Sequence, residues 1–271
     1  MPKIDSLSET ETRLSVLEST LGDRLWKSVL QEAIAGRLTT QLESDGTADI
    51  LLDQIKAAHR EAFLAEQAKA KAAAEKLGKK FVPKKYTPLT FSQIPQSEIP
   101  FNIPDNWKWV RLGQIGNWGS GSTPDRNNPK YYNGDIIWIK TGELNNSIVY
   151  DSEEKISEEA LQKGSFKINK IGDVMIAMYG ATIGKLGIAG AEMVTNQACC
   201  GCSLYGAVSN KYLFYYLMAN KDRFIKMGAG GAQPNISRTK IIAYPIPLPP
   251  LSEQERIVAK LDRLRGALGR D

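Results

Sequence analysis

Proline divides this chain into three parts. Five prolines lie within residues 81–104, and four more lie within residues 245–250. Proline has no amide donor and fixes its own backbone angle, so neither stretch is expected inside a helix or in a central strand. Regular structure is therefore expected before, between and after these two stretches.

The part before the first proline stretch has the pattern of two helices. Ser8 and Glu11 form a capping box, and apolar residues then recur every three to five residues until Gly36, where a glycine can end a helix. A polar break follows at residues 43–47. A second helix is predicted from this break to about Leu77.

The second helix has an apolar seam whose spacing alternates between four and three residues, as in a coiled coil. Alanine at most of these positions lets a partner helix approach closely but buries little area, so this helix needs a partner to be stable. The seam consists of Leu51, Ile55, Ala58, Ala62, Ala65 and Ala72.

The part after the second proline stretch predicts another heptad helix. Ser252 and Glu255 form a second capping box. The same spacing then continues through Ile257, Leu261, Leu264 and Leu268. We expect these long helices to flank the middle of the chain and to form an antiparallel coiled-coil spacer, within one chain or against a second copy.

The middle of the chain has a different texture. Short apolar runs at residues 136–139 and 174–178 are separated by Gly, Asn, Asp and Pro, which predicts short strands, with a helix near residues 211–227. The expected fold class is α+β, with one mixed domain between helices. The expected regions are a helical spacer (1–80), a proline-rich linker (81–103), the mixed domain (104–250) and a C-terminal spacer helix (251–271).

Composition excludes several classes of protein. With 271 residues, 42% of them hydrophobic, the chain has too many apolar residues to stay disordered. It has no apolar run long enough to cross a membrane and no signal-peptide pattern at the N-terminus, so we expect a cytoplasmic protein. The single histidine, His59, argues against histidine-rich metal sites and most histidine-dependent catalysis.

The cysteines and methionines are interpreted as core residues. Cys199, Cys200 and Cys202 have the wrong spacing for zinc and cannot build a disulfide framework, so small buried residues on a strand are expected. The core is also expected to include Met175, Met178, Tyr179 and Met193. We therefore expect neither metal ligands nor a cofactor site in this chain.

The charge permits a polyanionic partner without demanding one. The net charge is +5, and residues 101–250 hold 16 basic against 12 acidic residues, whereas residues 1–100 balance at 14 of each. The basic run from Lys76 to Lys85 is interpreted as a solvated linker. A basic excess in the middle domain favours contacts with phosphates there.

Two motifs resemble catalytic loops but depart from them. Residues 180–185, Gly-Ala-Thr-Ile-Gly-Lys, resemble a phosphate-binding loop, but three residues rather than four separate the glycines, and Leu186 stands where Ser or Thr is needed. A glycine-rich turn after a buried strand is expected, with Lys185 free to meet a phosphate. Residues 128–131, Asn-Pro-Lys-Tyr, resemble the Asn-Pro-Pro-Tyr loop of adenine methyltransferases without its second proline, which predicts a surface turn. No catalytic residue is expected.

An ordered set of short segments covers nearly the whole chain. It begins at residues 103–113, 119–124 and 132–142, continues through 172–174, 180–185, 195–198 and 233–237, and closes at 246–258; residues 30–38 and 51–55 precede it. In this order the segments resemble the target-recognition domain and helical spacer of type I restriction-modification specificity subunits. The stretch at 246–258, Ile-Pro-Leu-Pro-Pro-Leu-Ser-Glu-Gln-Glu-Arg-Ile-Val, is the most specific of them.

This resemblance implies a non-catalytic reader of double-stranded DNA. In that family the specificity subunit docks two adenine methyltransferase subunits, which carry S-adenosylmethionine, and through them the restriction subunits, which use ATP and Mg. A complete subunit has two recognition domains, whereas this chain has one, so it resembles half a subunit and is expected to form a homodimer. The alternatives are a small DNA adenine methyltransferase and a coiled-coil adaptor that binds only protein.

Polar loop residues are the candidate DNA contacts. Arginine suits guanine, and asparagine or glutamine suits adenine, whereas lysines and hydroxyls suit phosphates. Family members read different sequences, so base contacts are expected outside the shared motifs, and Thr123, Lys185 and Gln233 are assigned to structure or to phosphates. The candidates are Thr123, Arg126, Asn127, Lys130, Tyr132, Lys140, Lys185, Gln233, Asn235 and Arg238.

Overall fold

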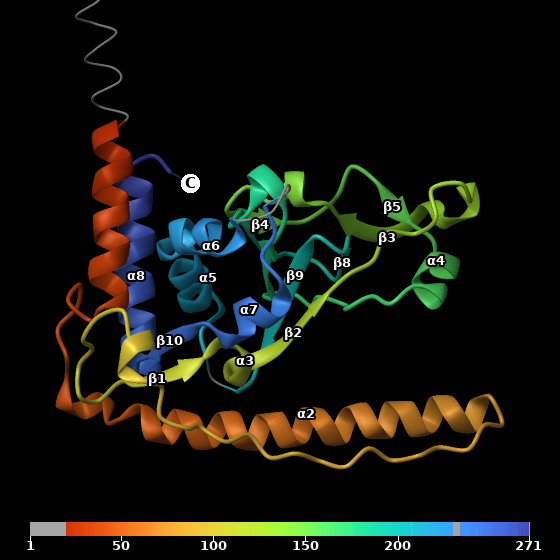
Figure 1. Cartoon of the computed structure of the whole chain (residues 1–271), viewed down its shortest axis with the longest axis horizontal. Coiled ribbons are helices and arrows are strands. Elements are labelled where there is room, and N and C mark those ends of the chain that lie inside the picture. Colours follow the sequence, from red (N-terminus) through yellow and green to blue (C-terminus); the bar gives the residue numbers. More distant parts are fainter. Residues whose placement is uncertain (1–19, 207, 230–233, 271) are drawn as a thin grey trace, which may run out of the picture.

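The computed structural model describes residues 20–206, 208–229 and 234–270. The first predicted capping box, Ser8 with Glu11, lies outside the described residues. Within them, the fold is α+β as expected, with long helices on one side of a domain built from short strands (Figure 1).

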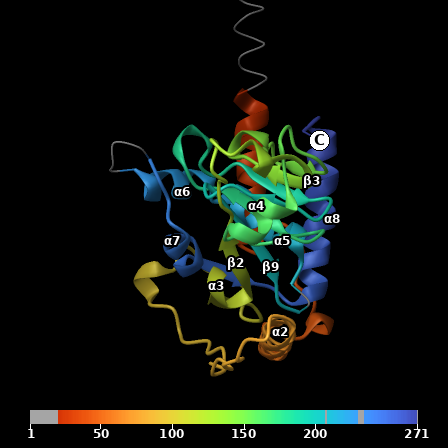
Figure 2. The same ribbon diagram turned by 90° about the vertical axis from the view of Figure 1, so that its right-hand side faces the viewer.

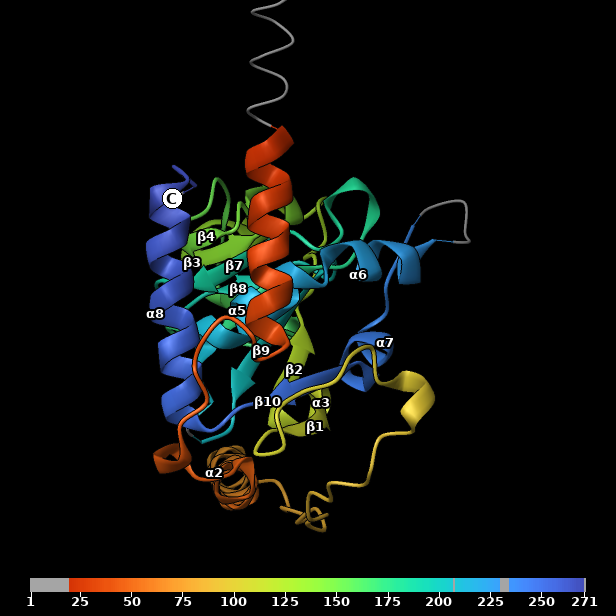
Figure 3. The ribbon, with the colours of Figure 1, turned by 90° about the vertical axis from the view of Figure 1, so that its left-hand side faces the viewer.

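Two of the long helices lie side by side and antiparallel. Residues 20–34 are helical and run beside α8 (Leu251–Ala267) in Figures 1 and 3. Arg270 pairs with Asp23 near one end of the two helices. The Lys260 ammonium, in the middle of α8, donates to the carbonyl of Leu38, which follows the first helix, 2.7 Å away. The predicted seam residues Ile257 and Leu261 are buried, in the same core cluster as Trp26 of the first helix.

The beginning of α8 differs from the prediction. Pro250 is its N-cap and no side chain caps it, so the expected capping box of Ser252 and Glu255 is wrong. The Ser252 hydroxyl instead donates to Asp45 in the 3-10 turn η1 (Glu43–Asp45), 3.0 Å away. Ser252 is the second residue of α8 rather than its N-cap, so its hydroxyl does not stand where it could accept from the first free amides of the helix.

Gly36 ends the first helix, as predicted. Its φ of +73° lies in the left-handed region, and a Cβ atom there would come within 2.6 Å of the ring of Pro104. Both the backbone angle and the close approach of the linker require glycine at this position.

The helix α2 (Ala48–Lys76) confirms the second predicted helix and lies crosswise at the foot of the first pair (Figure 1). Its buried residues are Ala48, Leu51, Leu52 and Ile55, all in its first turns. The later seam alanines, Ala62, Ala65 and Ala72, are exposed. No helix among the described residues covers this part of the seam.

The linker, rather than a helix, runs back along the outer part of α2. Tyr86 packs against His59 and Phe63, with ring centroids 5.5 and 5.2 Å apart, and the Lys84 amide donates to the Gln67 side chain. The 3-10 turn η2 (Gln96–Glu98) follows in the same stretch. An extended chain therefore covers one side of α2. The seam alanines Ala62 and Ala65 instead line a cleft between α2 and residues 166–170 and 203–205 of the mixed domain.

The described residues in the middle of the chain form three small sheets. The largest has the order β2 (Gly116–Ser120), β9 (Cys199–Leu204), β6 (Val174–Ala177), β7 (Leu186–Ala189) and β4 (Ser147–Val149), and only the β4–β7 pair among these is parallel. The second has the order β5 (Lys155–Ile156), β3 (Tyr132–Ile139) and β8 (Val194–Thr195). The strands predicted at residues 136–139 and 174–178 are confirmed as β3 and β6.

The second proline stretch contributes a strand of the third sheet. In it β10 (Pro245–Leu248) pairs with β1 (Lys108–Arg111) alone. The hydroxyl of Tyr212 donates to the Pro247 carbonyl, 2.7 Å away, and that of Tyr216 to the Pro245 carbonyl. A strand with a partner on only one side tolerates prolines because it needs fewer amide donors.

Helices and 3-10 turns complete the domain. The helix expected near residues 211–227 is two helices, α5 (Asn210–Ala219) and α6 (Lys221–Gly228), that meet at Asn220. The others are α3 (Leu112–Ile115), α4 (Glu158–Lys163), α7 (Arg238–Ala243), η3 (Pro129–Tyr131), η4 (Thr141–Glu143) and η5 (Gly180–Thr182).

One core joins the regions that the sequence separates. Trp26 of the first helix, Ile55 of α2, Val174 of the large sheet, Leu213 of α5 and Ile257 of α8 belong to the same buried cluster. A smaller cluster around Trp138 and Ile156 holds β3, β5 and α4 together as a lobe, called here the β3 lobe. The flanking helices are therefore packed on the mixed domain rather than separate from it.

The prediction that the cysteines are buried on a strand is confirmed. Cys199, Cys200 and Cys202 are buried and unbonded on β9. Burial raises the pKa of Cys200 to about 12, so its thiol stays protonated. Tyr179 is the exception among the expected core residues, because it follows the end of β6 and is 39% exposed. No helix among the described residues is long and apolar enough to span a membrane.

Candidate nucleic-acid interface

The structure places the predicted contact residues in two groups. The first group lies on the loop before β3, on β3 or just after it, and consists of Thr123, Arg126, Asn127, Lys130, Tyr132 and Lys140. Lys185, Asn235 and Arg238 lie near η5 and α7. Gln233 lies outside the described residues.

In the first group, the side chain of Arg126 is held in place by several neighbours. Its guanidinium forms an ion pair with Glu154 and lies over the rings of Tyr132 and Trp138, 4.7 and 5.0 Å from their centroids. The Tyr132 hydroxyl donates to the Pro124 carbonyl, 2.7 Å away. The hydrogen bond from Arg126 lowers the pKa of Glu154, so this carboxylate stays charged.

The other residues of the first group are exposed or paired. The Lys140 ammonium lies 3.0 Å from Glu154 and 3.2 Å from Glu153. Asn127 and Lys130 are exposed, and their backbone amides donate to the side chains of Asp125 and Asn128. The predicted surface turn at residues 128–131 is confirmed as η3. Cations and carboxylates are therefore mixed on this part of the surface.

The second group is organised by the glycine-rich turn at residues 180–185, which follows β6 as predicted. Gly180 and Gly184 have φ values of +61° and +78°. A Cβ atom on Gly184 would lie 2.8 Å from the side chain of Lys221, so the turn sits directly against the beginning of α6. The Lys185 backbone donates to the Thr182 carbonyl and accepts from the Ala177 amide. Its ammonium has no hydrogen bond or ion pair to any described residue and can meet a phosphate.

The segment before α7 is bound to the same turn. The Gly180 amide donates to the Pro234 carbonyl, 2.9 Å away, and Tyr179 and Asn235 form an isolated antiparallel bridge. The Asn235 amide donates to the Gly228 carbonyl at the end of α6. Backbone hydrogen bonds thus join η5, α6 and the start of α7 into one surface.

This surface, called here the η5–α6–α7 surface, is basic. Its cations are Lys185, Lys221, Arg223, Lys226 and Lys240. Within residues 179–185, 221–229 and 234–243 the single carboxylate is Asp222, which pairs with Lys27. Arg223 and Lys240 donate to neutral oxygens, the Tyr244 hydroxyl and the Met227 carbonyl. The positive charge therefore lacks carboxylate partners within this surface.

Figures 2 and 3 show where this surface lies. In both views α6, α7 and the turn near η5 occupy the side of the molecule that is opposite to α8. Arg238, the first residue of α7, turns away from α6: its guanidinium approaches the Trp118 carbonyl of β2 at 3.5 Å. There it lines a cleft between β2 and α2, together with Glu66 and Lys167.

Gln197 links the two groups and was not among the predicted contacts. The Thr123 hydroxyl donates to its side-chain carbonyl. The next residue, Ala198, accepts from the Met178 amide at 2.8 Å, and the Met178 carbonyl accepts from the Ile236 amide at 2.9 Å. Gln197 is exposed. Its position in the shared segment at residues 195–198 was the available sequence signal.

The cations of α6 were also missed. Lys221, Arg223 and Lys226 lie outside the shared segments, and the sequence signal was that Asp222 is the only acid from residue 221 to residue 240. A run of basic residues with so few acids is typical of a phosphate-binding surface.

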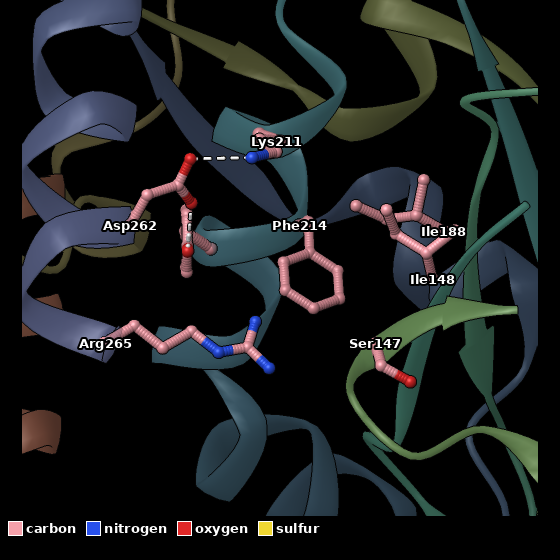
Figure 4. A pocket seen from close by; sticks show the side chains of 8 residues that line it. Ser147, Ile148, Ile188, Lys211, Phe214, Asp262 and Arg265 are labelled. Atoms are coloured by element: carbon pink, nitrogen blue, oxygen red, sulfur yellow. Dashed lines mark hydrogen bonds and ion pairs between the residues drawn. The ribbon is translucent and has the colours of Figure 1, made fainter. Parts of the chain in front are cut away.

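A separate hollow of about 370 Å³ lies between α5, α8 and β4 (Figure 4). None of the predicted contacts lines it. Its charged groups already have partners: Lys211 lies 2.6 Å from Asp262, and Arg265 donates to the Asn146 carbonyl at 2.7 Å. The ring of Phe214 lies between these groups and Ile148. The hollow therefore offers apolar surface but few free polar groups.

Comparison with known proteins gives consistent matches. Residues 104–268 match the family described as type I restriction modification DNA specificity domain. The specificity subunit of the Escherichia coli type I restriction enzyme EcoR124I/EcoR124II is 27% identical over 162 residues, 58% of this chain and 40% of that protein. The MjaIX specificity subunit of Methanocaldococcus jannaschii is 32% identical over 165 residues, 59% of this chain and 38% of that protein. The chain thus spans less than half the length of these relatives.

A solved structure shows the same fold. The crystal structure of the HsdS subunit from Thermoanaerobacter tengcongensis superimposes with a TM-score of 0.52 at 21% identity, over 82% of this chain and 49% of that chain. At this level of identity the match concerns the fold alone.

Proposed function

The chain belongs to the type I restriction modification DNA specificity domain family, and from this premise we propose that it is the DNA-recognition subunit of a type I restriction-modification system. In this proposal it selects the target and catalyses no reaction. The observation that carries the proposal is the η5–α6–α7 surface, which holds five cations and whose single carboxylate, Asp222, is paired with Lys27. Duplex DNA is the polyanion that a specificity domain has to hold.

The two groups of residues have different roles in this proposal. The η5–α6–α7 surface binds phosphates, which positions the duplex without reading it. The β3 lobe, whose charges are balanced, reads base edges through Arg126 and its neighbours. The linkage from Thr123 through Gln197 to Met178 holds the β3 lobe and the η5–α6–α7 surface in a fixed relative position.

The chemistry belongs to partner subunits. We assign S-adenosylmethionine to the methyltransferase subunits, and ATP and Mg to the restriction subunits that bind through them. Among the described residues, no group of three or more His, Cys, Asp or Glu could hold a metal ion. The residues of this chain would bind and orient DNA so that the target adenine reaches the partner.

We further propose that two copies of the chain act together. In this proposal α2 of a second copy enters the cleft between α2 and the mixed domain, which Ala62 and Ala65 line. It packs there against these alanines and Ala72, since small side chains let two helices approach closely. Such a pair has two recognition domains related by a two-fold axis. The target would then be two identical, inverted half-sites, and α2, about 44 Å long, is long enough to separate them by a duplex turn.

The test is methylation with and without the partner. The purified chain is expected to shift duplex DNA in low salt and to transfer no methyl group from labelled S-adenosylmethionine. Addition of the cognate methyltransferase subunit is expected to produce sequence-specific adenine methylation. Methyl transfer by the highly purified chain would favour the small methyltransferase. Failure to bind DNA, both alone and with the partner, would favour the protein-binding adaptor.

A further inference from the structure

Arg126 has an unusual arrangement for an arginine on a loop. Its guanidinium lies over two aromatic rings and is fixed on one edge by Glu154, yet the side chain is 52% exposed. Only Nη1 has a hydrogen-bond partner among the described residues. Nε and Nη2 therefore remain available as donors, and the two rings and Glu154 already fix the orientation of the guanidinium plane.

The aromatic support is itself anchored. Trp138 is buried, and its indole N–H donates to the Ser122 carbonyl at 3.0 Å, while the Tyr132 hydroxyl donates to the Pro124 carbonyl at 2.7 Å. These two carbonyls lie just before Arg126 in the chain. The loop that carries the arginine is thus bound to the same two rings on which its guanidinium rests.

Glu154 is fixed as firmly as the arginine. One carboxylate oxygen accepts from Arg126, and the other accepts from the Lys140 ammonium at 3.0 Å. Its backbone carbonyl accepts from the Ser152 hydroxyl at 2.6 Å, and that hydroxyl oxygen accepts from the Trp138 amide at 3.1 Å. Each carboxylate oxygen of Glu154 is therefore already held by a cation of the same lobe.

We propose that Arg126 reads a guanine through its free edge and that Glu154 is the positioning residue that holds it there. A planar guanidinium with two adjacent donors matches the O6 and N7 acceptors of guanine in the major groove. Pre-ordering a long side chain before binding reduces the entropy cost of the contact. The inference rests on the proposed DNA-recognition function and names the base that this site takes.

The position in the chain supports the same role. Arg126 lies between the shared segments at 119–124 and 132–142, and Glu154 lies between those at 132–142 and 172–174. Residues that distinguish one target from another have to lie outside the segments common to the family. Lys140, which lies inside a shared segment, holds Glu154 and is not itself expected to read a base.

A purely structural ion pair is the competing explanation. Lys163 provides a control with similar surroundings in the same lobe, since it lies over one ring, that of Tyr131, at 5.5 Å and pairs with Glu159 at 2.7 Å. Loss of Lys163 removes a cation, a ring contact and an ion pair, but no planar donor edge. The effects of losing Arg126 and of losing Lys163 on DNA binding can therefore be compared directly.

The experiment selects bound sequences from a randomised duplex library, using the full chain in complex with its cognate methyltransferase subunit. We expect the wild-type complex to enrich a motif that contains guanine at one position. Arg126→Ala and Arg126→Lys are expected to reduce the preference for that guanine by about tenfold or more and to leave the rest of the motif intact, because lysine keeps the charge but lacks the planar edge. Lys163→Ala is expected to weaken binding to all sequences equally.

Glu154→Gln provides a second readout, because it is expected to change unspecific DNA binding and the preference for guanine in opposite directions. Loss of a negative charge beside DNA is expected to increase binding to unrelated duplexes, whereas loss of the charged partner of Arg126 is expected to reduce the preference for guanine. An unchanged motif in Arg126→Lys and Glu154→Gln would overturn the proposed reading of guanine. A wild-type complex that enriches no motif at all would overturn the DNA-recognition function as well.

Discussion

The hydroxyl of Thr123 donates a hydrogen bond to the side-chain carbonyl of Gln197, 74 residues further along the chain. This contact joins the loop that carries Arg126 to the segment from which Ala198 accepts the Met178 amide. The loop and the glycine-rich turn therefore share one support.

Loss of the Thr123 hydroxyl is expected to loosen the loop without unfolding the domain. Thr123→Val keeps the shape of the side chain and removes one hydrogen bond, which typically contributes about 0.5–1.5 kcal/mol. Amide hydrogen exchange is expected to speed up in residues 122–131 and to stay unchanged in β9. Unchanged exchange in the loop would show that Gln197 does not restrain it.

Loss of a lysine from the η5–α6–α7 surface is expected to weaken binding to all duplexes alike. Lys240→Ala removes one phosphate contact, so the slope of log affinity against log salt should fall by about one. Lys260→Ala is the matched control, because both ammonium groups donate to backbone carbonyls, but Lys260 lies on α8, on the opposite side of the molecule. Equal effects of the two changes in a salt titration would contradict the proposed DNA face.

Leu261 is expected to be essential for stability. It is fully buried in the core that joins the first helix, α5 and α8. Leu261→Ala should lower the free energy of unfolding by about 2–5 kcal/mol because it leaves a cavity, as measured by denaturant titration. Leu64→Ala on α2, where the side chain is 55% exposed, should change it by less than about 0.5 kcal/mol.

A charge on the alanine seam of α2 is expected to separate two copies. Ala65→Glu places a carboxylate where a second helix would approach, so light scattering should show a monomer while the unfolding midpoint stays unchanged. Ala70→Glu is the control, an exposed alanine of the same helix outside the seam. A wild-type chain that stays monomeric within a functional methyltransferase complex would contradict the proposed homodimer.

Stability is expected to fall as the pH falls from about 7.5 to 5.5. Burial of His59, between Tyr86 and Tyr205, lowers its pKa from the usual 6.5. The unfolded chain therefore binds the proton at a higher pH than the folded chain, so stability is complete above the unfolded pKa and is lost below it. His59→Gln should flatten the dependence in this range, since His59 is the only histidine. An unchanged slope in the variant would assign it to another group.

The candidate site could be predicted from the sequence only in part. Polar loops rich in Gly, Asn and Arg indicated the segments around Arg126 and Lys185, and both lie on the surface. The sequence did not indicate that Glu154 would pair with Arg126, because 28 residues separate them. It also did not indicate that Lys221 would lie against Gly184, since the contact depends on how α6 packs on the sheet.

By itself, the sequence determined the local elements of this protein. The helix at Ala48–Lys76, its polar break, the end at Gly36, the strand at Val174–Ala177 and the turn after it depend on periodicity, backbone angles and donors of neighbouring residues. Tertiary structure alone decided which elements meet. It paired α8 with residues 20–34, laid the linker along α2 and gathered the lysines of η5, α6 and α7 on one face. Each of these contacts buries surface between segments that lie far apart in the chain, and a local sequence pattern does not indicate which distant segment will cover it.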